Sequence, residues 1–235
     1  MPHGALDPEK FRETLMAWTS LLLARLEAKR GDQHHAHIAI DGKTIRRSHD
    51  FSNDRNAIHM LNVWSVDHGI SLGQIKTADK SNEIKAIPEL LALLDIRNTT
   101  ITTDAMGCQR EIASTIIVDG GDYLLAVKDN QPNLHHQIKA AFEYANGDKM
   151  SFSEMEPMVL HAFVDIDKGH GRIEERGVQL SRDLDWIPNG DKWSGLNCVV
   201  KVTRRRTIIK TDKTSEEVSY VTVRVPTSSI SSQFA

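Results

Sequence analysis

Cysteine, one-sided charge and long apolar runs are all scarce in this sequence of 235 residues. The two cysteines, Cys108 and Cys198, lie far apart, which excludes a disulfide framework and a paired-cysteine zinc motif. A formal net charge of −3 excludes a uniformly basic nucleic-acid coat, although a local basic stripe is still allowed. No apolar run approaches the roughly 20 residues of a membrane span, and no signal peptide opens the chain. We therefore expect a soluble, cytoplasmic protein without a membrane partner.

The composition itself is that of a folded protein. Hydrophobic residues make up 40% and charged residues 26% of the chain, values near the globular average. Such a chain can bury a core, and its length suits one large domain or one domain with an insertion.

The first 150 residues alternate between helical and strand patterns. A helix is expected to begin at Asp7 and Pro8 and to end before Gly31, because apolar residues recur there every three or four positions. Pro88 is expected near a helix start or at a kink. The predicted elements that follow are strand 37–41, hairpin 57–75, helix 84–94, strand 99–103, helix 112–117, strand 123–127 and helix 130–147.

The last third changes character, because helical periodicity almost disappears after residue 150. Strands are predicted at 158–164, 172–180, 197–203, 207–211 and 218–225. Alternating strands and helices followed by strands indicate an α/β fold, a mixed sheet flanked by helices with a β-rich insertion in the C-terminal third.

Two aspartates occur in matching contexts. Asp41 follows the apolar run Ile38–Ile40, and Asp104 follows the β-branched run Thr99–Thr103. In α/β sheets, functional groups gather at strand ends, and Mg²⁺ prefers carboxylates with water and substrate phosphate as ligands. Each aspartate alone is better explained as a helix N-cap or turn former, the commonest role of Asp after a strand. Lys43, Arg46 and Arg47 follow the first carboxylate and favour a phosphate-binding role.

Several motifs resemble the DDE transposases of bacterial insertion sequences, in the branch of the H-repeat-associated proteins. They occur in the family's order over about residues 5–220. The matching stretches are IAIDGKTIR at 38–46, LGQIK at 72–76, KSNEI at 80–84, IPELL at 87–91, TDAMGCQ at 103–109, YLLAVK at 123–128 and HGRIE at 170–174.

The resemblance implies a ribonuclease-H-like fold in which Asp41 and Asp104 lie side by side as catalytic metal ligands. It further implies metal-dependent cleavage of transposon ends and joining of the freed 3′-hydroxyl to target DNA, with two Mg²⁺ or Mn²⁺ ions. Expected partners are double-stranded DNA, as transposon ends and target, and a second copy in a homodimer on those ends, at the nucleoid. The expected domains are an N-terminal helix (1–31), the catalytic core (36–150), the insertion (151–225) and an atypical tail (226–235).

Two interpretations exist for the third catalytic acid. Glu174 is one candidate for a catalytic carboxylate, but its place between Arg172 and Arg176 favours an ion-paired strand residue of the insertion. The family pattern also predicts a Trp-x-Ile-Glu helix past Tyr220, which this sequence lacks. We therefore expect a truncated core that does not complete transposition. The alternatives are an inactive remnant that at most binds DNA, and a stand-alone ribonuclease-H-like nuclease.

Basic residues suggest further DNA contacts. Residues 196–213 are rich in Lys and Arg, and Arg204, Arg205 and Arg206 are expected on a hairpin that is either a DNA-tracking face or a solvated tip. Lys128 is a further candidate for a DNA contact. The clustered histidines at 34–37 and 135–136 lack the spacing of a zinc site, so surface positions are expected for them.

Overall fold

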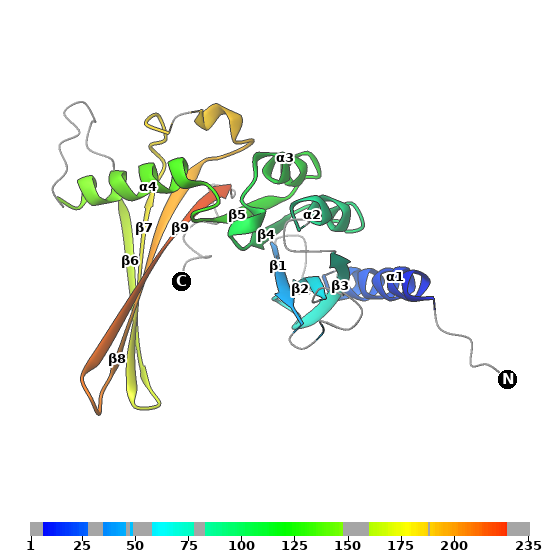
Figure 1. The fold of residues 1–235 in the computed structure, drawn as a ribbon, viewed down its shortest axis with the longest axis horizontal. Coiled ribbons are helices and arrows are strands. Elements are labelled where there is room, and N and C mark those ends of the chain that lie inside the picture. The colour runs from blue at the N-terminus through cyan, green and yellow to red at the C-terminus, as the bar shows by residue number, and fades with distance from the viewer. Residues whose placement is uncertain are drawn as a thin grey trace. The chain divides into compact units, whose positions relative to one another are not determined.

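The computed structural model describes residues 7–27, 35–45, 48, 58–77, 83–147, 160–187 and 189–224 (Figure 1). The chain has an α/β fold and divides into two compact units, Met1–Asp122 and Tyr123–Ala235. This division falls ahead of the domain boundary expected near residue 150. The division falls there because the strand at 122–127 pairs with the last strand of the chain, so its residues from Tyr123 on belong to the second unit.

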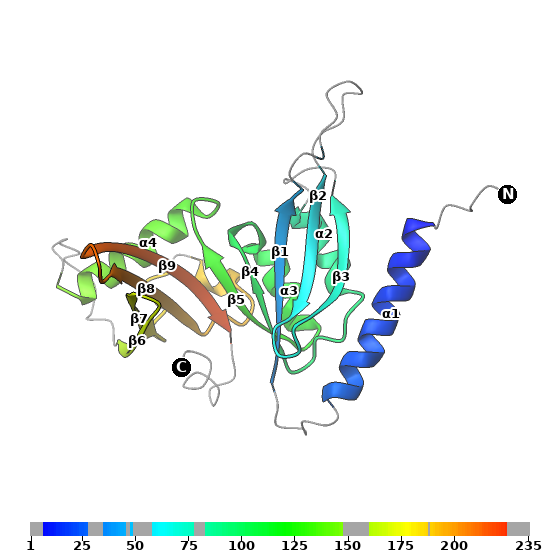
Figure 2. The ribbon, with the colours of Figure 1, turned by 90° about the horizontal axis from the view of Figure 1, so that it is seen from below.

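The first unit contains a mixed sheet with the strand order β3-β2-β1-β4. Neighbouring strands are antiparallel except β1 and β4, which are parallel. Figure 2 shows β1, β2 and β3 side by side, with the helix α1 alongside β3. The strands are β1 (Ala36–Thr44), β2 (His59–Ser65), β3 (Ile70–Thr77) and β4 (Thr99–Thr103), and the helices are α1 (Pro8–Glu27), α2 (Glu83–Leu91), α3 (Arg110–Val118) and the 3-10 turn η3 (Ala105–Gly107).

Alternating burial fixes which side chains face the core of this unit. Every second residue of β2 is buried, from His59 through Leu61 and Val63 to Ser65. Ile38 and Ile40 of β1 lie opposite this set and are buried with it. Helix α2 packs over these strands, and its Pro88 lies in the second turn rather than at the helix start. Asp41 and Lys43 alternate with Ile40 and therefore project from the other face of the sheet.

The second unit is an antiparallel sheet with the strand order β5-β9-β8-β7-β6. Helix α4 (Pro132–Ala145) lies across one end of the strands, and their other ends extend away from it as a long arm (Figure 1). The strands are β5 (Asp122–Val127), β6 (His161–Gly169), β7 (Arg172–Ser181), β8 (Cys198–Ile208) and β9 (Lys213–Arg224), and a 3-10 turn, η4 (Gly190–Lys192), precedes β8.

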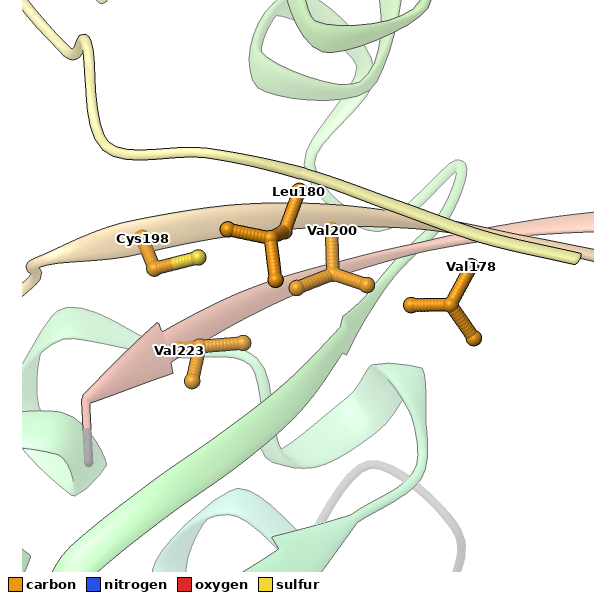
Figure 3. Close-up of a cluster of buried hydrophobic side chains, with 5 residues drawn as sticks. All are labelled: Val178, Leu180, Cys198, Val200 and Val223. Atoms are coloured by element: carbon orange, nitrogen blue, oxygen red, sulfur yellow. The ribbon is translucent and has the colours of Figure 1, made fainter. Parts of the chain in front are cut away.

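The two faces of this sheet are packed differently at the α4 end. On one face a hydrophobic cluster forms, and its side chains project to the same side of the strands (Figure 3). On the other face α4 is anchored, since Phe142 packs on Tyr220 and Gln179 exchanges hydrogen bonds with Asn146 at 2.8 and 3.2 Å. The cluster contains Val178, Leu180, Cys198, Val200 and Val223.

One predicted strand is absent. The segment 207–211 does not form a strand of its own, because Thr207 and Ile208 end β8 and a turn follows. In that turn the Thr211 amide donates to the Ile208 carbonyl at 3.2 Å, and Asp212 adopts a left-handed conformation with φ 52°. Aspartate tolerates that conformation, so the polar tip turns back into β9. Among the described helices, none is long and apolar enough to cross a membrane.

Candidate active site

The sheet of the first unit places the two predicted aspartates after the same paired position of two neighbouring strands. Ile40 of β1 is paired with Thr103 of β4, the last pair of two neighbouring parallel strands, and Asp41 and Asp104 directly follow this pair. Adjacent strands lie about 4.8 Å apart, which brings the two backbones within reach of one shared ligand. Both side chains are exposed. The expected adjacency of these two strands is therefore present in the structure.

The local structure of Asp41 differs from the expectation. The strand does not end at Asp41, because β1 continues to Thr44 through its pairing with β2, in which Asp41 lies opposite Asn62. Asp41 is therefore not a helix cap or a turn former. Asp104 does follow its strand, and its Oδ1 accepts a hydrogen bond from the Met106 amide at 3.0 Å. This capping hydrogen bond holds one carboxylate oxygen in place, and the side chain stays exposed to solvent.

The chemistry of these two side chains suits a hard divalent cation. Carboxylate oxygens are preferred ligands of Mg²⁺, which usually takes one or two of them and completes its shell with water and phosphate. Lys43 projects from the same face of β1 as Asp41 and is exposed, so it adds a positive charge where a phosphate would approach. Among the described residues, no group of three or more His, Cys, Asp or Glu side chains gathers to hold an ion.

Beneath Asp41 lies a buried acid–histidine pair for which the sequence analysis assigned no role. Glu83, the first residue of α2, is hydrogen-bonded through Oε1 to His59 Nε2 of β2, and the Glu83 and His59 side chains are 1% and 4% exposed. The other ring nitrogen of His59, Nδ1, is hydrogen-bonded to the Thr44 hydroxyl at 2.8 Å. A Cβ at Gly42 would collide with Glu83 Oε1, so the carboxylate packs directly on the β1 backbone.

The only signal for this pair in the sequence is the motif KSNEI, which ends in an acid at a helix start. His59 sits in an ordinary strand pattern. Neither residue can be recognised as a partner of the other until β2 and α2 are packed together.

Glu174 lies in β7 of the second unit and is surrounded by arginines. Its Oε1 is 2.7 Å from Arg172 Nε and 3.2 Å from an Arg206 nitrogen, and its Oε2 is 3.4 Å from an Arg176 nitrogen. Register explains the cluster, because Glu174 is directly opposite Arg206 on β8. Both carboxylate oxygens are thus engaged by cations, which is the geometry of the ion-paired alternative for this residue.

The predicted DNA-binding residues are spread over different surfaces. Arg204 and Arg206 project from one face of the arm and Arg205 from the other. Arg205 is paired with Glu216 at 2.9 Å and with Glu175 at 3.7 Å, so the basic stripe is partly neutralised. Lys128 follows β5 and is exposed, as are Lys43 and Arg204, whereas Arg46 lies outside the described residues.

Comparison with known proteins identifies the family. The family described as "Transposase DDE domain" matches residues 32–217. "Uncharacterized protein in dhlA 3'region" of Xanthobacter autotrophicus is 37% identical over 86% of this chain and 63% of its own length. "H repeat-associated putative transposase YhhI" of Escherichia coli (strain K12) is 40% identical over 92% of this chain and 53% of its own.

Other matches extend this pattern. "Putative transposase YncI" of Escherichia coli (strain K12) is 53% identical over 59% of this chain and 53% of its own length. A solved piggyBac transposase synaptic complex with hairpin DNA matches 80% of this chain and 33% of that one. Its TM-score of 0.35 and 10% identity are too low to indicate a shared fold. The chain spans between 45% and 63% of the curated relatives it matches. Because the family match covers most of its length, with the two aspartates at adjacent strands inside it, the chain belongs to the DDE transposase family.

Proposed function

We propose that this chain is the catalytic core of a transposase that cleaves the DNA ends of an insertion sequence and joins them to target DNA. The observation that carries the proposal is the register of Ile40 with Thr103, which sets Asp41 beside Asp104 within the family match. The mixed sheet, with β1 and β4 parallel and α2 packed on it, supports a ribonuclease-H-like fold for residues 36–150.

Asp41 and Asp104 are the proposed metal ligands, and Mg²⁺ or Mn²⁺ is the proposed cofactor, in two ions when DNA is bound. Bound there, the metal would activate the attacking oxygen and stabilise the leaving one. Lys43 would contact the phosphate that reaches this face, and the exposure of both aspartates leaves room for a duplex. We assign Glu174 an ion-pairing role in the arm, since three arginines already engage its carboxylate.

Duplex DNA is the proposed partner, both as transposon ends and as target, with two copies of the chain acting on paired ends. Arg204 and Lys128, both exposed, are the proposed backbone contacts of the second unit. Phosphate contacts of this kind position DNA without reading its sequence, so end recognition is expected to need other contacts.

The direct test is a gel assay with the purified chain, Mn²⁺ or Mg²⁺ and labelled duplexes that carry the ends of the element. Joined products that disappear in both Asp41→Asn and Asp104→Asn would support the proposal and would overturn the expectation that this chain does not complete transposition. Cleavage without joining would favour a nuclease, and a mobility shift without chemistry would favour a DNA-binding remnant. Cleavage that persists in both variants would show that the aspartates are not the metal ligands.

A further inference from the structure

The last four residues of β1 depend on fewer neighbouring strands than the rest. From Ile38 to Ile40 the strand is paired with both β2 and β4, but the pairing with β4 ends at Ile40 and Thr103. Among the described strands, Asp41 through Thr44 are paired with β2 alone. Two-stranded ribbons twist more strongly and are marginally stable without further packing. Asp41 therefore sits on a part of the strand whose position needs another constraint.

Glu83 and His59 supply contacts at this place. Glu83 packs against Gly42 with no space for a Cβ between them, and His59 links Glu83 to the Thr44 hydroxyl. The contacts thus fall on the first and the third residue after Asp41 and tie β1 to both β2 and α2. The Glu83 carboxylate also lies at the first residue of α2, where the helix dipole favours a negative charge.

The arrangement retains a polar atom that simple packing would not require. Glu83 is buried, and its Oε2 has no hydrogen-bond partner among the described residues. Burying a carboxylate oxygen without a partner is unfavourable, so an apolar side chain at this position would serve core packing better. A rigid acid–histidine–hydroxyl chain provides what an apolar contact does not, a directional constraint on the strand.

We propose that Glu83, His59 and Thr44 form a positioning relay that fixes the Asp41 carboxylate for metal binding through the β1 backbone. The relay acts from the helix-covered face of the sheet, whereas Asp41 projects from the opposite face, so none of the three side chains is itself a ligand. This inference rests on the proposed function, because it presumes that Asp41 binds the metal. Groups that orient metal ligands commonly change metal affinity 10- to 100-fold when they are removed.

Thr44→Val is the primary test, because Thr44 is exposed and valine keeps the β-branched shape while removing the hydroxyl. We expect the Mn²⁺ dissociation constant, measured by isothermal titration calorimetry, to rise about 10-fold. Thr44→Ser, which keeps the hydroxyl, should retain the wild-type affinity. The midpoint of thermal unfolding in metal-free buffer should stay within a few degrees of wild type in both variants.

His59 allows the two halves of the relay to be separated. In His59→Asn the amide can still reach Thr44 but not Glu83, and in His59→Gln it can reach Glu83 but not Thr44. Both variants should weaken Mn²⁺ binding. The matched control is His35→Gln, because His35 pairs with the buried Asp122 at 3.1 Å in the same unit, ahead of β1. It should lower the unfolding midpoint without changing Mn²⁺ affinity.

The outcomes separate this inference from the proposed function. If Asp41→Asn loses Mn²⁺ binding while Thr44→Val keeps wild-type affinity, the relay is wrong and the metal site stands. If Asp41→Asn keeps wild-type affinity, the metal site itself is wrong and the relay falls with it. A lower unfolding midpoint without a change in Mn²⁺ affinity in the His59 variants would show that the pair is only structural.

Discussion

Ile40 of β1 and Thr103 of β4 are the last paired residues of two neighbouring parallel strands, and an aspartate follows each of them. In a parallel pair, residues in register project to the same face of the sheet. Ile40 and Thr103 are both buried, whereas Asp41 and Lys43 project from the opposite face of β1 and are exposed, and Asp104 is exposed directly after β4. The relationship gives the two aspartates a common place in the fold and leads to the first prediction.

Asp41→Asn and Asp104→Asn should each abolish Mn²⁺ binding and leave the fold intact. Two carboxylates at adjacent strands repel each other without a cation, so each variant should gain up to about 1 kcal/mol of stability in metal-free buffer. Titration calorimetry measures the binding and chemical denaturation measures the stability. Asp119→Asn, at an exposed aspartate of the same unit, is the control and should bind Mn²⁺ as wild type does. Unchanged affinity in both site variants would contradict the prediction.

Glu174→Gln should affect stability rather than metal binding. The change removes the charge that three arginines contact, and it should cost about 1 kcal/mol because those arginine side chains are about half exposed. Glu175→Gln is the matched control, since among the described side chains Glu175 has one arginine partner, Arg205, at 3.7 Å. Loss of Mn²⁺ affinity or of strand joining in Glu174→Gln alone would instead make Glu174 the third ligand.

Arg204 and Arg205 should contribute differently to DNA binding. Arg205 is engaged by Glu216 and Glu175, whereas Arg204 forms no ion pair with any other described side chain. Arg204→Ala should therefore weaken duplex binding uniformly across sequences and reduce the salt dependence by about one released counterion. Fluorescence anisotropy over a range of salt concentrations measures both. A larger loss in Arg205→Ala than in Arg204→Ala would argue against this assignment.

His37 should make the protein less stable in mild acid. Burial lowers the pKa of His37 below its ordinary value of 6.5, and Asp67 offsets part of this effect. Since the unfolded chain binds the proton more readily, stability is full above pH 6.5 and falls as the pH drops from there toward the folded-state pKa. Denaturant titrations between pH 7.5 and pH 5 should show a weaker decline in His37→Gln. An identical pH profile in wild type and variant would contradict the lowered pKa.

Most of the elements could be predicted from local patterns. The hairpin at 57–75 appears as β2 and β3, because alternating apolar residues flank a short turn at Gly69. The strand before Asp104 and helix α4 after Pro132 follow from β-branched residues and from Pro at the helix start. The error at 207–211 has the same local origin, since β-branched residues in a polar tip resemble a short strand.

Most element types and the family could be predicted from the amino-acid sequence, because hydrophobic period and motif order are properties of neighbouring residues. The continuation of β1 past Asp41, and the contacts of Glu83 with His59 and Gly42, became visible in the folded chain. The same holds for Glu174, which lies opposite Arg206 in the pairing of β7 with β8. Each of these depends on strand register or on helix-to-sheet packing between distant segments. Such contacts are set by how buried faces fit together, and no local pattern encodes them.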